Sequence, residues 1–246
     1  MNYLGHPFVC KEIFEDFNQY HLVGSWLPDL WPFIDHKVLT YDNWHEGGEK
    51  MLRFLDHKYP EIKGIGLGMM AHGYTYGADR FNREIEERYA DQRDEMTKKI
   101  VSATPNLVTQ PKGLEGRFHN FLWWGVDVQL LRNEPSFIKQ IQNLTTDIDR
   151  SELSGLIAEM TNKDRIEIDR LLSQLLDPLT AQNLSNIRGL AYIWQQVAKG
   201  LPERDQVLVP QCVDAFEYCA DLVADEWEDI VELVVDGVRQ NLKQFI

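Results

Sequence analysis

The sequence predicts an all-α fold, a multi-helix bundle, and its pattern supports this class in two ways. Apolar residues recur mostly three and four positions apart, which is the period of a helix with one buried face, whereas strict alternation over the length of a strand is hard to find. Proline and glycine interrupt the pattern at "ATPNLVTQPKGLEG" and "KGLPERDQVLVP", which is typical of loops. Between these interruptions we predict helices near 6–22, 46–59, 64–78, 80–103, 115–132, 135–146, 151–162, 164–176 and 181–199.

The clearest predicted helix is the last, from about Pro210 to Phe245. Apolar residues alternate three and four positions apart from Val213 onward, and proline at the start suits the first turn of a helix. The opposite face carries acidic residues, which we interpret as solvent-exposed surface.

The composition narrows the classes of partner. The chain has 25 basic and 39 acidic residues, and the resulting formal charge of −14 repels nucleic acids and anionic lipid surfaces. The N-terminus "MNYLGHPFVCKEIF" lacks the basic and long apolar stretches of a signal peptide, and no apolar run approaches the roughly 18 residues of a membrane span. We therefore expect a cytoplasmic protein with reduced thiols that binds no nucleic acid and has no transmembrane segment.

All seven histidines fall at or before position 119. His72 and Asp79 are seven positions apart, and His119 and Asp127 are eight apart, so a continuous helix would present each pair on one face, two turns apart. Helical bundles build metal sites from such faces turned inward. Histidine nitrogen together with carboxylate oxygen suits zinc, manganese or iron(II).

One domain is expected to span residues 1–246, because no Ser/Gly-rich linker divides the chain. A chain of this length buries roughly 70–75% of its unfolded surface, which is ample for one large core. Since the histidines gather in the first half, residues 1–132 are the predicted metal-site half and residues 133–246 are the supporting helices.

The segment "HLVGSWLPDLWPFIDH", residues 21–36, crowds polar and aromatic side chains around a Pro-Asp step. Pro28 is expected to end regular helix and to expose Asp29 on an irregular segment, facing histidines from other helices. The alternative is an aspartate that only caps a turn, since Pro-Asp is common turn chemistry. Three tryptophans are expected to wall a substrate pocket, with burial in the core as the competing interpretation: Trp26, Trp31 and Trp44.

Short motifs in the first half resemble two groups of helical metallohydrolases, the bacterial zinc-dependent phospholipase C family and, more distantly, the acyl carrier protein phosphodiesterases. "MNYLGH" followed by "HLVGSWLPDL" is similar to their opening. "NWHEGGEKMLRFL", "GIGLGMMAHGYTYGADRF" and "GRFHNFLWWGVDVQLL" then supply later histidines, as in the phospholipase-like group. The similarity covers about residues 1–132. It implies these metal ligands: His6, Asp29, His45, His72 and His119.

The chain departs from these groups where they usually place an acid one turn after each later histidine. Tyr76 and Trp123 stand at those positions, and the nearest acids, Asp79 and Asp127, come one turn further along. A site with one or two metals rather than three is therefore favoured. An aspartate that does not bind the metal would orient a ligand imidazole or act as the general base.

Two functions of different classes follow from this pattern. A metal-dependent hydrolase would use a metal-activated water, and a small phosphorylated or phospholipid-like substrate suits a bound cation best. A non-catalytic helical interaction protein would instead retain a degenerate metal site, an alternative that Tyr76 and Trp123 support. The hydrolase is favoured, with zinc or another divalent transition metal, manganese or iron, as cofactor.

Overall fold

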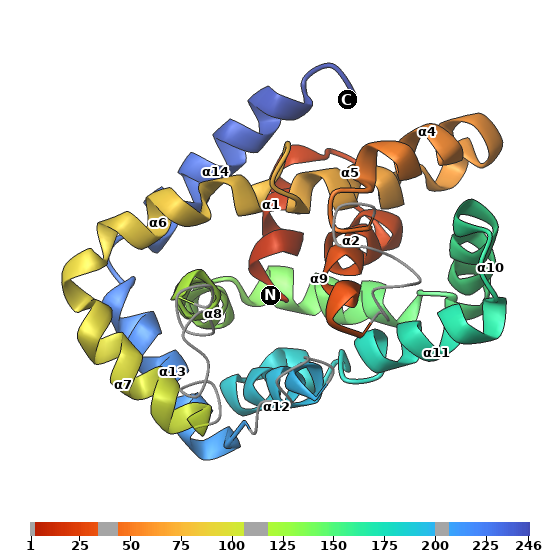
Figure 1. Ribbon diagram of the computed structural model, residues 1–246. Helices are drawn as coiled ribbons and strands as arrows, with labels where there is room; N and C mark the ends of the chain where they lie inside the picture. The colour runs from red at the N-terminus through yellow and green to blue at the C-terminus, as the bar shows by residue number, and fades with distance from the viewer. Residues whose placement is uncertain (1–2, 34–43, 106–117, 200–206) are drawn as a thin grey trace.

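The computed structural model describes residues 3–33, 44–105, 118–199 and 207–246, and it confirms the all-α class, with no strand in these ranges (Figure 1). The N-terminal half contains α1 (Gly5–Ile13), α2 (Gln19–Trp26), α4 (Gly48–Lys58), α5 (Gly64–His72), α6 (Asn82–Arg88), α7 (Arg93–Ala103) and α8 (Phe118–Asn133). The C-terminal half contains α9 (Pro135–Thr146), α10 (Arg150–Thr161), α11 (Arg165–Leu176), α12 (Ile187–Ala198), α13 (Val209–Leu222) and α14 (Trp227–Leu242). Short 3-10 helices lie between them: η1 (Leu27–Phe33), η2 (Pro60–Ile62), η3 (Ala78–Phe81), η4 (Ala90–Gln92) and η6 (Asn183–Ser185).

Two helices of the N-terminal half are shorter than predicted. The helix expected over 6–22 is divided into α1 and α2, because Phe14 is extended and the side chain of Asn18 caps α2 by accepting a backbone N–H. The helix expected over 64–78 ends with α5, since Gly73 leaves the helix with an extended backbone.

Two further predicted helices are also divided. The helix expected over 80–103 is interrupted by η4, and the one expected over 210–245 is broken between α13 and α14. This second break lets α13 pack on α7, α8 and α12, whereas α14 packs on α1, α5 and η3. A single straight helix would not reach both sets of neighbours.

Helix α5 is the centre of the N-terminal half. It lies between α2 and α4, and all of its residues are buried (Figure 1). A Cβ on Gly68 would lie 2.4 Å from the carbonyl oxygen of His21 in α2, and one on Gly66 would lie 2.5 Å from Cα of Leu52 in α4. Glycine is therefore required at both positions for the three helices to approach this closely, and the contact sets His72, the last residue of α5, beside α2.

The supporting helices bury an aromatic core of their own against α8. Trp124 of α8 stacks on Phe216 of α13, with ring centroids 4.5 Å apart. Gln129 of α8 ties the same pair of helices, since its Nε2 donates to the carbonyl oxygen of Ala220 at 2.7 Å. Across the described ranges, none of the helices combines the length and the apolar character that a membrane crossing requires.

Candidate metal centre

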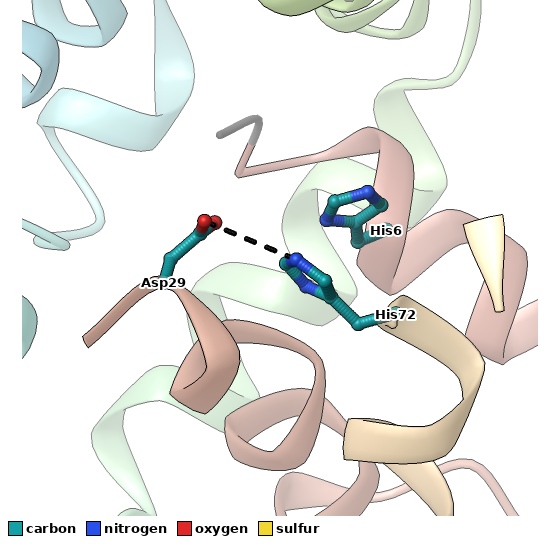
Figure 2. A group of neighbouring side chains, drawn as sticks. All are labelled: His6, Asp29 and His72. Atoms are coloured by element: carbon teal, nitrogen blue, oxygen red, sulfur yellow. Dashed lines mark ion pairs between the residues drawn. The ribbon is translucent and has the colours of Figure 1, made fainter. Parts of the chain in front are cut away.

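Five polar side chains from five separate segments meet inside the N-terminal half. His6 Nε2 lies 3.5 Å from Asp79 Oδ1, and His45 Nε2 lies 3.1 Å from Asp79 Oδ2. His72 Nε2 lies 3.7 Å from Asp79 Oδ2 and 3.9 Å from Asp29 Oδ1. Figure 2 shows the Asp29 carboxylate directed at the His72 ring, with the His6 imidazole beside that ring. Among the described residues, two groups bring ligand atoms close enough to hold a cation: His6, Asp29 and His72, and His45, His72 and Asp79.

His72 presents a ligand nitrogen that is fixed in its tautomer. The packing of α5 on α2 places His72 Nδ1 2.7 Å from the carbonyl oxygen of Ser25. A carbonyl oxygen only accepts, so Nδ1 carries the proton and Nε2 keeps its lone pair for the centre. Burial and, after it, the nearby His6 lower the pKa of His72 well below its ordinary value, so the ring stays neutral.

Glu46 is a residue of the site that sequence reasoning missed. Its Oε1 lies 2.8 Å from His45 Nδ1, which leaves Nε2 of that ring directed at Asp79. The same carboxylate accepts the backbone N–H groups of Tyr74 and Thr75 and the Thr75 hydroxyl. Carboxylates in this position are common outer partners of metal-bound histidines. The available signal was the acid directly after His45 in "WHEG".

Asp29 enters the site from η1. The expected irregular segment is thus a 3-10 helix, and Pro28 fits its first turn, where no N–H is needed. The Asp29 side chain is buried, and burial raises its pKa. Its Oδ2 has no hydrogen-bond partner among the described residues. A buried carboxylate oxygen without a donor, beside histidines, is suited to a cation.

The charges around Asp79 are strongly coupled. Burial opposes the charged form of His45, but hydrogen bonds with Asp79 and Glu46 outweigh it and raise the pKa of His45 to about 9. Burial likewise opposes charge on Asp79, yet hydrogen bonds with His45 and His6 hold the pKa of that carboxyl well below its usual range. The donor set of three imidazoles and two carboxylates fits zinc, manganese or iron(II).

Asp79 reaches the histidines by a route that its spacing did not predict. Helix α5 stops at His72, and the turn at residues 73–77 brings η3 back, so that Asp79 faces His72 across this turn. Tyr76 lies in the same turn, and its hydroxyl donates to Glu49 at 3.0 Å. Asp79 is therefore placed as a candidate ligand, not as a base lying outside the group.

His119 and Asp127 do not join the group. His119 belongs to neither ligand set, since its backbone N–H and its Nδ1 meet Glu86 Oε1 at 2.9 and 3.2 Å. Burial raises the pKa of Asp127 to about 7, an effect that its backbone hydrogen bonds only partly offset. These bonds anchor the start of α1, because the Asp127 carboxylate accepts the N–H groups of Tyr3, Leu4 and Gly5.

The tryptophans expected to wall a pocket are core residues where the structure describes them. Trp26 and Trp44 are fully buried, and their indole N–H groups donate to the carbonyl oxygens of Tyr3 and Leu27, at 3.1 and 2.7 Å. The side chain of Trp31 lies outside the described part. The competing interpretation, burial in the core, therefore holds for Trp26 and Trp44.

Comparison of the chain with family models, with curated proteins and with solved structures finds no match. The likeness to the metallohydrolases therefore stays a prediction from short motifs. The geometry of the centre is therefore the basis for a proposed function.

Proposed function

We propose that the protein is a metal-dependent hydrolase that acts on phosphoesters. One observation carries this proposal: three imidazole Nε2 atoms and two carboxylates converge, and the Nδ1 atoms of two of the rings are already bound to acceptors. Such side chains are preorganised as ligands, because neither of these rings has to turn when an ion binds. The converging residues are His6, Asp29, His45, His72 and Asp79.

A divalent ion in this position would lower the pKa of a bound water toward about 7 and polarise a phosphoryl oxygen. The most exposed side of the centre indicates where a substrate would approach. Asp79 is the most exposed of the five residues, at 8%, and the neighbouring turn after α5 carries Tyr74, which is 42% exposed. Substrate would therefore enter beside this turn. The net charge of −14 does not forbid an anionic substrate, because the ion is the largest local charge.

A second candidate function, a non-catalytic helical protein with a structural ion, is favoured by the burial of all five residues. Structural sites are closed by protein ligands, whereas catalytic sites keep one position open to water or substrate. The two functions therefore predict different behaviour once the protein is loaded with metal.

The deciding experiment measures metal content and turnover on full-length protein purified without chelator or an affinity tag. We expect about one equivalent of a transition metal, and hydrolysis of bis(p-nitrophenyl) phosphate or p-nitrophenyl phosphate that stops when a chelator removes the metal. Protein that neither carries nor takes up zinc, manganese or iron overturns the proposal. Metal-loaded protein without turnover favours the structural ion.

A matched pair of variants assigns the metal to this centre. In His72→Asn the amide nitrogen takes the place of Nδ1 and can still donate to the carbonyl oxygen of Ser25, but the Nε2 ligand is gone. His57→Asn makes the same change at an exposed position of α4. His72→Asn should lose metal and turnover, and His57→Asn should keep both.

A further inference from the structure

Tyr74 lies at the solvent-facing edge of the metal centre, in the turn between α5 and η3. Its backbone N–H donates to Glu46 Oε1 at 2.9 Å, so the turn is tied to the carboxylate that orients His45. The Tyr74 and His45 rings lie 5.9 Å apart between centroids, while Tyr74 remains 42% exposed. The side chain therefore borders both the centre and solvent.

A chain of hydrogen bonds runs along the same edge of the centre, from Trp123 through Asn82 to Asp79. The Trp123 indole N–H, which can only donate, lies 2.8 Å from Asn82 Oδ1. The Asn82 amide nitrogen therefore faces the other way, and it donates to Asp79 Oδ1 at 3.1 Å. Burial and Asp79 raise the pKa of the Tyr74 hydroxyl, whereas Asn82, which lies near it, acts in the opposite direction. A phenol hydroxyl can both donate and accept, so the Tyr74 hydroxyl has a proton to donate to an acceptor that arrives from solvent.

From this arrangement we propose that Tyr74 contacts the substrate, with its hydroxyl donating a hydrogen bond to a phosphoryl oxygen of an ester bound at the metal centre. This inference rests on the proposed hydrolase function. The surroundings support it, because besides burial the charges of Asp79, Glu86 and Glu46 raise the pKa of the Tyr74 hydroxyl, and acids this near repel a phosphate. A neutral donor among these acids gives an anionic substrate a hydrogen-bond partner on this side of the centre.

The test compares Tyr74→Phe with Tyr76→Phe in full-length protein loaded with one equivalent of zinc. Tyr74→Phe keeps the ring and the backbone bond to Glu46 and removes only the hydroxyl. Tyr76→Phe removes a hydroxyl of the same turn that donates to Glu49 instead. Calorimetric titration with inorganic phosphate and kcat/KM for the phosphoester are measured for both variants, together with zinc content and thermal midpoint.

We expect Tyr74→Phe to bind phosphate about tenfold more weakly or worse, as for a lost hydrogen bond to a charged group, and to reduce kcat/KM by a similar or larger factor. Zinc content should be unchanged, and Tyr76→Phe should match the wild type in phosphate binding. If Tyr74→Phe keeps the phosphate affinity of the wild type, the substrate contact is refuted, and the hydrolase proposal is unaffected. Loss of zinc from Tyr74→Phe likewise refutes the contact and leaves the hydrolase proposal unaffected. A wild type that binds phosphate but turns over no ester refutes the hydrolase, while the phosphate comparison still decides the contact. A zinc-loaded wild type that binds no phosphate overturns the contact as well.

Discussion

Zinc affinity should depend steeply on pH, because the ion competes with a proton for His45. In the metal-free protein the pKa of His45 is about 9, since hydrogen bonds with Asp79 and Glu46 outweigh the effect of burial. Zinc requires the neutral imidazole, so binding expels this proton. The affinity should therefore rise with pH up to about 9 and level off above it.

The magnitude follows from the distance between pH 7 and this pKa. At pH 7 about one molecule in 100 has a neutral His45, so the apparent affinity should increase about tenfold per pH unit up to about pH 8. From pH 7 to pH 9, where half of the molecules are neutral, the gain should be about 50-fold, or about 2.3 kcal/mol. The stability of the metal-free protein has the opposite dependence. A raised histidine pKa stabilises the fold fully below the unfolded value of about 6.5, and that contribution is lost as pH rises through about 9.

The assay is competition for zinc against a chromophoric chelator whose own protonation is known, from about pH 6.5 to about pH 9.5. His45→Asn is the matched control, because its amide nitrogen can still donate to Glu46 but does not titrate. The variant should bind more weakly at high pH and show a flatter profile. The same slope in variant and wild type would refute the assignment of the competing proton to His45.

Three further results are expected. Glu46→Gln should weaken zinc binding about 10- to 100-fold, the usual loss for an outer partner of a ligand histidine; unchanged affinity in chelator competition would mean that Glu46 only ties the turn after α5. Asp127→Ala should lower the free energy of unfolding in urea by about 3 kcal/mol or more, because three buried N–H groups lose their acceptor and a cavity opens; a stable variant that has lost its zinc would instead place Asp127 in the metal site. Gly68→Ala should lower the same free energy by about 1–3 kcal/mol, since its Cβ would lie 2.4 Å from the carbonyl oxygen of His21. The control Gly155→Ala, with the nearest side chain 3.8 Å from the new Cβ, should raise it by up to about 1 kcal/mol, and equal effects of the two would contradict the close packing of α2 and α5.

The apolar period predicted the helical class because each helix buries one face, but it did not mark where helices end. Phe14 lies between α1 and α2 and Val223 lies between α13 and α14, yet both side chains are buried. The apolar pattern therefore continues through the breaks. Only the backbone, which turns at these residues to reach different neighbours, separates the helices.

The metal ligands, like the helix ends, can be predicted only in part from the sequence, because tertiary packing decides which side chains meet. The motifs identify candidate histidines, but the partner of each ring is decided by packing. His119 was predicted from the same resemblance as the other ligands, and the structure gives it Glu86 as partner instead. The spacing of His72 and Asp79 predicts one face of a continuous helix, but Gly73 ends α5 before Asp79 is reached. The predicted ligands that the structure brings together are His6, Asp29, His45 and His72.

The glycines of α5 bear on the order in which the protein folds. Each glycine disfavours helix by about 1 kcal/mol relative to alanine, and this nine-residue helix contains three, Gly64, Gly66 and Gly68. So short a segment has little tendency to become helical alone, and its helix depends on docking between α2 and α4. His72 would therefore reach His6 and Asp29 only after those neighbours are in place. We expect an ion to be acquired by a nearly native chain, so the metal would select the folded state without nucleating it.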